Sequence, residues 1–258
     1  AAIPIFTLAG YILAESNISD RLIKFFKSSL GWLPGSTVLI VVILCAFFTA
    51  LTGGSGVTIL ALGAILYPIL VHDGYSKRFS LGIITTAGSL GLLFPPSLPA
   101  IIYSVTAGIN PLELFRQALI PAIFLMSIMF FYGLYMLPKN KKIEKFNLKN
   151  AYNSAKIAKW EIAIPVLIIL SLFSGFATLV ESAALLVLYV LTVELYIFKD
   201  VSFKDLPKII IDCSTLVGGV LIILGFAMGF TGYLVDDQIP LKILNFVQNT
   251  IYSKIVFL

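Results

Sequence analysis

Two interruptions of otherwise apolar sequence bring together residue types that could bind an ion. Residues 53–56 read Gly-Gly-Ser-Gly, and residues 94–99 read Phe-Pro-Pro-Ser-Leu-Pro. Hard cations such as Na⁺ prefer carbonyl, hydroxyl and carboxylate oxygens as ligands. Glycine reaches backbone conformations that turn carbonyls inward, and proline removes N–H groups that would otherwise occupy helix carbonyls. The two breaks therefore predict a site for a dehydrated cation, built largely from carbonyl and hydroxyl oxygens.

The breaks supply named candidates for this site. Because the three prolines have no N–H, we expect the carbonyls of residues 91–93 to be free of the helix hydrogen-bond ladder. Helices that restart near Val57 and Ala100 would direct their positive dipole ends at the same region, which favours an anionic substrate. No carboxylate lies in either break. The candidate Na⁺ ligands are Gly53, Gly54, Ser55, Gly56, Leu92 and Pro95, and the candidate substrate-cavity residues are Ser55, Thr58, Pro96 and Ser97.

The composition places both breaks in a membrane. Hydrophobic residues make up 59% of the chain and charged residues 12%, and the mean hydropathy is +1.01, whereas a soluble domain has about 25% charged residues. Stretches that approach or exceed the roughly 20 residues of a spanning helix lie at 117–137, 161–176, 180–198 and 209–235. The sequence therefore predicts an all-α polytopic membrane protein. Irregular backbone at membrane depth survives only where protein encloses it, so function is expected at the breaks.

The positive charges assign a topology. All Lys and Arg except Arg116, Lys242 and Lys254 fall in four segments, 15–34, 71–78, 138–160 and 199–208. Lys and Arg concentrate in cytoplasmic loops, and every cluster lands on that side if residues 35–70 leave and return to it and residues 79–109 cross outward. Residues 138–160 are then a Lys-rich cytoplasmic linker. Between 18 and 33, basic and apolar residues alternate as in an amphipathic helix at the interface, although an ordinary connecting helix fits as well.

Residues 35–70 are predicted to form a re-entrant helical hairpin. Each arm of roughly 14 to 18 residues would measure about 21 to 27 Å, which is shorter than the hydrocarbon core of roughly 30 Å. Two full spans return the chain to the same side and therefore remain an alternative. The Pro-rich segment makes residues 79–109 a discontinuous helix.

A short echo suggests an inverted repeat. Gly-Tyr-Ile-Leu at 10–13 and the residues after it are matched by Gly-Tyr-Leu-Val at 232–235 and the residues after it, at an offset of about 221. The assigned topology places the first copy at the inside and the second at the outside, an arrangement that many secondary transporters use. The expected organisation is a first repeat at 1–137, the linker at 138–160, and a second repeat that starts at 161–258 and ends before its hairpin. The chain has no initial Met, signal peptide or polar tail, so we expect a fragment.

The remaining reactive side chains have simpler interpretations. Glu181 lies in an apolar stretch, where an acid is a functional candidate by default, but it may equally sit at the outer interface near the turn at Gly175. Cys45 and Cys213 are expected to be small buried hydrophobes, with no disulfide and no metal other than Na⁺. His72 is expected in a solvated turn. The basic residues follow topology, so no nucleic-acid partner is expected.

Five motifs together resemble a known family. They are residues 3–10 (Ile-Pro-Ile-Phe-Thr-Leu-Ala-Gly), 52–58 (Thr-Gly-Gly-Ser-Gly-Val-Thr), 74–76 (Gly-Tyr-Ser), 94–99 with Tyr103, and 175–178 (Gly-Phe-Ala-Thr) with Glu181 and the Ala-Ala pair that follows. In this order they resemble the large membrane subunit of tripartite ATP-independent periplasmic (TRAP) transporters, the DctM family. Leu179 and Val180 stand where that family often has Pro.

The resemblance implies an elevator-type, Na⁺-driven importer of organic acids such as dicarboxylates or sialic acid. Its implied partners are a periplasmic substrate-binding protein and a small four-helix membrane subunit of the DctQ type, in the cytoplasmic membrane of a bacterium or archaeon. It also implies that residues 53–56 and 92–97 form one Na⁺ site and half of the substrate cavity.

Three other functions compete with this interpretation. A related Na⁺/carboxylate or anion carrier would share the hairpin and broken helix but work without a binding protein. An enzyme is disfavoured, because the chain has one His and lacks the His-Glu-x-x-His and Gly-x-Ser-x-Gly motifs. A purely structural helical subunit would not need paired breaks.

Overall fold

The chain forms a helical protein in the computed structural model, which describes residues 2–138, 147–175 and 177–250. Twelve α-helices are present in these ranges, with one 3₁₀ turn and one π-helical segment. Five helical segments are long and apolar enough to cross a membrane: Ser55–His72, Lys77–Ala107, Pro111–Tyr135, Leu179–Phe198 and Leu206–Asp236. The prediction of an all-α, multi-pass membrane protein is confirmed at this level.

The helices follow one another with short connections. Their bounds are α1 (Ala2–Glu15), α2 (Ile18–Leu30), α3 (Ser36–Thr52), α4 (Ser55–His72), α5 (Lys77–Leu90), α6 (Leu98–Ala107), α7 (Pro111–Tyr135), α8 (Leu148–Ile157), α9 (Lys159–Phe173), α10 (Leu179–Thr192), α11 (Leu206–Asp236) and α12 (Ile239–Thr250). The 3₁₀ turn, Gly91–Leu93, follows α5, and the π segment, Val193–Phe198, follows α10.

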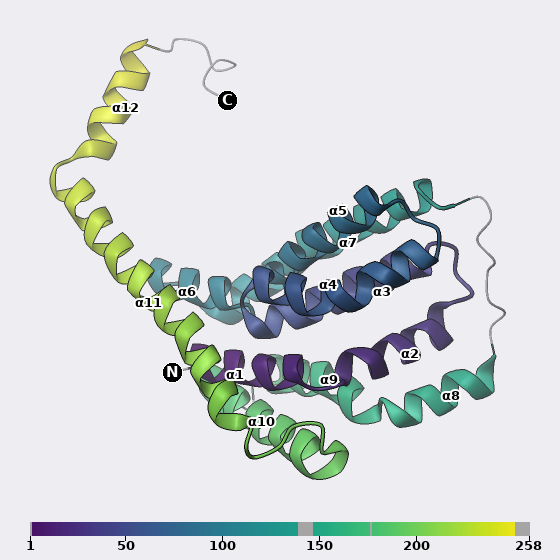
Figure 1. The fold of residues 1–258 in the computed structure, drawn as a ribbon. Helices are drawn as coiled ribbons and strands as arrows, with labels where there is room; N and C mark the ends of the chain where they lie inside the picture. Colours follow the sequence, from purple (N-terminus) through teal and green to yellow (C-terminus); the bar gives the residue numbers. More distant parts are fainter. Residues whose placement is uncertain (1, 139–146, 176, 251–258) are drawn as a thin grey trace. The chain divides into compact units, whose positions relative to one another are not determined.

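Two compact units divide the chain, residues 1–213 and residues 214–258. In the first unit, α3, α4, α5 and α7 pack side by side, and α1 packs against both α3 and α10 (Figure 1). The core of this unit contains the large buried side chains Phe48, Phe115, Ile12, Leu44 and Ile164. The second unit holds the rest of α11 and α12, whose apolar side chains, such as Phe226 and Phe230, are exposed, as expected for lipid-facing helices.

Residues 35–70 form a helical hairpin, with α3 and α4 packed against each other. Gly53 ends α3 and Gly54 precedes α4. At the opposite end of the hairpin, the Thr37 hydroxyl donates a hydrogen bond to the Asp73 carboxylate. How deeply the hairpin enters the membrane stays a prediction.

The helix at 79–109 is discontinuous, as expected. It consists of α5, the 3₁₀ turn, four residues without helical structure or in a turn at 94–97, and α6. The predicted linker at 138–160 contains a helix that the sequence reading did not anticipate: α8 is capped by Asn147, whose Oδ1 accepts hydrogen bonds from the N–H groups of Lys149 and Asn150 at 3.0 and 3.3 Å.

Helix boundaries recur at the spacing of the sequence echo. Glu15 and Asp236 end α1 and α11, and Ile18 and Ile239 begin α2 and α12, so both boundaries repeat at an offset of 221 residues. The regularity supports an internal repeat. The opposite orientation of its copies, and the division at 1–137, 138–160 and 161–258, stay predictions.

Candidate ion and substrate site

The hairpin tip is shaped by Gly53. Its φ of 69° is left-handed, a conformation that costs roughly 1–2 kcal/mol for residues with a Cβ. A Cβ at this position would also lie 2.7 Å from the Cβ of Leu98, the first residue of α6. Glycine therefore ends α3 and lets the start of α6 lie against the tip.

The helix break packs against α3 in the same way. A Cβ at Gly91 would lie 2.5 Å from the Cβ of Thr49 and 2.6 Å from the carbonyl oxygen of Ala46. The contact of Gly91 with Thr49 and that of Leu98 with Gly53 bring together the two interruptions that the sequence singled out.

The carbonyls of the break are only partly free. The carbonyl of Gly91 accepts a hydrogen bond from the N–H of Phe94 at 3.1 Å, so the prediction that the prolines release it is wrong. A 3₁₀ turn supplies a donor three residues on, where an α-helix would have needed Pro95. The carbonyl of Leu92 faces Pro95 and Pro96 along the chain, and neither has an N–H. It keeps the role that the sequence predicted for it.

Buried hydroxyl groups surround this contact. Thr52 Oγ1 lies 3.1 Å from Thr58 Oγ1 and 3.5 Å from the carbonyl oxygen of Gly54. By contrast, Thr49 Oγ1 and Ser97 Oγ are buried and make no hydrogen bond with the described part of the chain. An unsatisfied buried polar group costs about 1–3 kcal/mol, so both oxygens are suited to receive a ligand.

Two helix N-termini start at this contact. α4 begins at Ser55 and α6 at Leu98, two residues before the predicted starts at Val57 and Ala100. The capping positions are Gly54 and Ser97, and neither provides a side-chain hydrogen bond to its helix. The first N–H groups of an α-helix have no partner within the helix, so these two uncapped ends can attract an anion.

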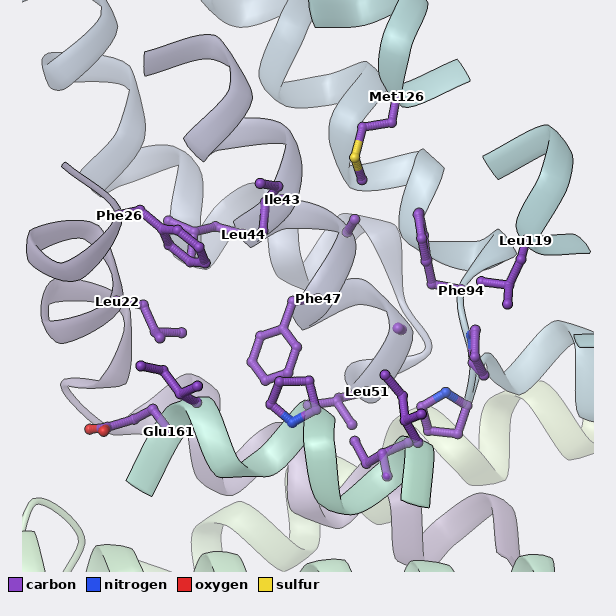
Figure 2. Close-up of a pocket in the computed structure, with 18 of the residues that line it drawn as sticks. Leu22, Phe26, Ile43, Leu44, Phe47, Leu51, Phe94, Leu119, Met126 and Glu161 are labelled. Carbon is purple, nitrogen blue, oxygen red and sulfur yellow. The ribbon is translucent and has the colours of Figure 1, made fainter. Parts of the chain in front are cut away.

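A cavity of about 640 Å³ lies beside the break. Figure 2 shows Phe47 and Leu51 of α3 on one part of its wall and Phe94 of the break on another. Pro95 and Pro96 also line it, whereas Ser55, Thr58 and Ser97 are not among its lining residues. The lining is apolar except for Arg116 and Glu161. This cavity is therefore poorly suited to an organic anion, and the substrate residues predicted at the tip stay a prediction.

Glu181 has a local structural role. With Thr178 it forms a capping box at the start of α10: one carboxylate oxygen accepts hydrogen bonds from the N–H of Thr178 at 2.7 Å and from its hydroxyl at 2.9 Å. Its suggested part in function stays untested. Cys45 and Cys213 are buried, as expected, and the side chain of His72 is exposed, as expected for a solvated turn.

Sequence reasoning missed a charged cluster on α2. The guanidinium of Arg21 contacts the carboxylates of Glu161 in α9, Asp200 after the π segment, and Glu194 within that segment. Hydrogen bonds from Arg21 and Asn17 lower the pKa of Asp200, although its partial burial acts in the opposite direction. The sequence offered one signal, three acids that border apolar stretches, but not their meeting at a single arginine.

The fold and the site together define a polytopic helical membrane protein whose polar centre lies at helix breaks, as in many secondary transporters. All 258 residues match a family model described as the tripartite ATP-independent periplasmic transporter, DctM component. The chain belongs to this family, which consists of transporter permeases and not of enzymes.

Curated relatives agree with the family. The C4-dicarboxylate TRAP transporter large permease protein of Rhodobacter capsulatus is 30% identical over 255 residues, which cover 93% of this chain and 58% of the relative. Its counterpart from Pseudomonas aeruginosa is 30% identical over 260 residues, covering 100% and 61%. The ectoine TRAP transporter large permease protein of Halomonas elongata is 28% identical over 248 residues, covering 95% and 58%. The chain thus spans about three fifths of their length.

Proposed function

We propose that the chain is part of the large transmembrane subunit of a Na⁺-coupled, binding-protein-dependent importer of organic acids. The observation that carries this proposal is the contact between hairpin tip and helix break, where Thr49 Oγ1 and Ser97 Oγ are buried without a partner in the described structure. In a family of transporter permeases, such a contact is the natural place for a coupling ion.

The ligand chemistry favours a monovalent cation. Residues 49–58 and 91–98 contain no ionisable side chain, and no group of His, Cys, Asp or Glu suited to a metal is found in the described ranges. Neutral carbonyl and hydroxyl oxygens bind Na⁺ without leaving a buried charge when it departs. Ser97, Leu92 and the predicted residues 53–56 are the proposed ligands, and Thr49 is added to them.

The uncapped starts of α4 and α6 support an anionic substrate near the same contact. Among the relatives, printed substrates include C4-dicarboxylates, ectoine and isethionate, and a small organic acid is proposed here. Elevator-type movement, with a second, inverted repeat facing this one, completes the proposed mechanism. The proposed setting is the cytoplasmic membrane of a bacterium or archaeon.

The proposed partners are a periplasmic substrate-binding protein and a small membrane subunit of the DctQ type. One relative, the isethionate TRAP transporter permease protein DctMQ of Oleidesulfovibrio alaskensis, is 27% identical over 260 residues. Uptake into vesicles that contain the full-length permease and its small subunit should depend on added binding protein. Uptake that persists without it would identify a binding-protein-independent carrier instead.

The Na⁺ site is tested by serine substitutions in the full-length transporter. Ser97→Ala and Ser55→Ala each remove a proposed ligand, and each should raise the Na⁺ concentration for half-maximal uptake by about tenfold or more, since hydrogen-bond-like contacts to charges contribute about 1.5–3 kcal/mol. Ser104→Ala is the matched control, because this buried serine of α6 already donates to the carbonyl of Ile101 at 2.7 Å. An unchanged Na⁺ dependence in Ser97→Ala, or an equal rise in Ser104→Ala, would contradict the site.

A further inference from the structure

The Arg21 cluster connects α2 with α9 and with the end of α10. Glu161 and Glu194 have no exposed side-chain surface, and that of Arg21 is 12% exposed. The aromatic ring of Phe198 covers the guanidinium at 3.8 Å. In Figure 2, Glu161 lies at the edge of the cavity with its carboxylate directed away from Phe47 and Leu51. The four charges are thus enclosed by protein on the side opposite the cavity.

The charges of the cluster do not balance. One guanidinium faces three carboxylates, so full ionisation would leave two uncompensated negative charges. A buried carboxylate without a counter-charge is so costly that such groups take up a proton instead. At least one of the three carboxyl groups therefore has to be neutral.

The contacts indicate which group this is. Asp200 and Glu161 take the Nη1 and Nε of Arg21, and Asp200 also accepts the N–H of Asn17 at 3.1 Å. The oxygens of Glu194 lie 3.4 and 3.5 Å from Nη2, beyond the roughly 2.7–2.9 Å of a strong charge-assisted hydrogen bond. Glu194 is both fully buried and the most weakly held.

A second observation points to the same proton. Oε2 of Glu161 is buried and makes no hydrogen bond with the described residues. An ionised carboxylate oxygen in this position needs a donor. A protonated Glu194, bound to the same guanidinium, is a carboxylic acid and can donate its O–H group.

The surrounding elements bring no second cation to the cluster among the described residues. The charged groups that act on Glu194 are Arg21, Asp200 and Glu161. Lys208 pairs with Glu15, and Lys159 lies over the ring of Trp160. The other charged side chains on α2, α8 and the segment after the π helix are exposed and have no ion pair to the cluster: Asp20, Lys24, Lys149, Lys156 and Lys199.

We propose that Glu194 is a proton-binding site, and that its protonated form secures α2 to α9 and to the end of α10. This proposal does not depend on the Na⁺ site. Because α2 continues through residues 31–35 into α3 of the hairpin, the cluster fixes the end of α2 that lies farther from the hairpin.

The test measures thermal unfolding of the purified full-length protein from mildly acidic to mildly alkaline pH. The folded protein keeps a proton that the unfolded chain releases, so wild-type stability should decrease as the pH rises, by up to about tenfold in the folding equilibrium per pH unit. Glu194→Gln replaces the protonated acid by a neutral group of similar shape. It should fold with nearly the wild-type midpoint at neutral pH and should lack this decrease.

Two control variants complete the test. Glu161→Gln removes the ionised partner of Arg21 and should lower the midpoint clearly, while Glu15→Gln, on the exposed pair with Lys208, should keep the wild-type pH profile. The proposal is overturned if Glu194→Gln fails to fold, if it lowers the midpoint as much as Glu161→Gln, or if its pH profile equals that of the wild type.

Discussion

The contact between hairpin tip and helix break and the Arg21 cluster both bury polar atoms, but with opposite chemistry. The contact, residues 49–58 and 91–98, offers hydroxyl and carbonyl oxygens and has no ionisable side chain. The Arg21 cluster consists of four ionisable side chains from α2, α9 and the segments after α10. Neutral oxygens can lose a cation without leaving a charge buried, whereas a charged cluster is costly to open. The first arrangement suits reversible binding, and the second suits a permanent connection.

The largest effect is expected from removing the cation of the charged cluster. Arg21→Ala would leave the buried acids Glu161 and Glu194 without a counter-charge, and breaking a buried ion pair in this way typically costs about 3–5 kcal/mol. Denaturant unfolding of the full-length protein would measure the loss. Arg21→Lys keeps the charge and should lose less. If Arg21→Ala and Arg21→Lys were equally stable, the cluster would not act through its charge.

A smaller loss is expected at the hairpin tip, where shape and not charge decides. Gly53→Ala should destabilise by about 2 kcal/mol or more, since the left-handed backbone alone costs roughly 1–2 kcal/mol and the new Cβ meets Leu98 at 2.7 Å. Gly108→Ala is the control: its φ is 66°, and a Cβ there would have nothing within 4 Å. The difference between the two variants isolates the contact with Leu98. Equal losses would mean that tip and break are not held together there.

The two regions also differ in how far the sequence predicts them. Glycine and proline mark the breaks in an apolar sequence, so the ends of α3 and α5 and the start of α6 follow from local rules. The partners of Arg21 lie 140, 173 and 179 residues away in the chain, and no local pattern records such distances. The charge pattern accounted for Arg21 as one of several cytoplasmic basic residues, a reading that needs no partner.

Thr49 shows the same limit within the candidate site. A threonine in an apolar helix usually bonds the carbonyl three or four residues earlier, and nothing in the sequence distinguishes Thr49 from such a residue. Its unpartnered hydroxyl becomes visible only because Gly91 lets the break lie against it. The carbonyl of Gly91 was mispredicted for a related reason: the choice between a 3₁₀ turn and an α-helical turn depends on this packing.

Thr49→Val should separate binding from stability. Valine has the same shape and removes an unsatisfied hydroxyl, so stability should stay within about 1 kcal/mol of the wild type, while the Na⁺ concentration for half-maximal uptake rises. Thr52→Val is the control, because its hydroxyl contacts Thr58 Oγ1 at 3.1 Å and its loss should lower stability. A Thr49→Val variant with reduced stability and unchanged Na⁺ dependence would make this hydroxyl a structural group only.

The smallest effect is expected at Glu181, an acid that belongs to neither region. Its carboxylate accepts the N–H and hydroxyl of Thr178 at the exposed start of α10, so Glu181→Gln should lower the unfolding midpoint only slightly. Gln can still complete a capping box, and the Na⁺ dependence of uptake should not change. Thr178→Ala, which removes the cap itself, should cost about 1 kcal/mol and serves as the comparison. If Glu181→Gln altered the Na⁺ dependence while Thr178→Ala did not, the carboxylate would act on the ion directly, and the division between a neutral binding contact and a charged structural cluster would fail.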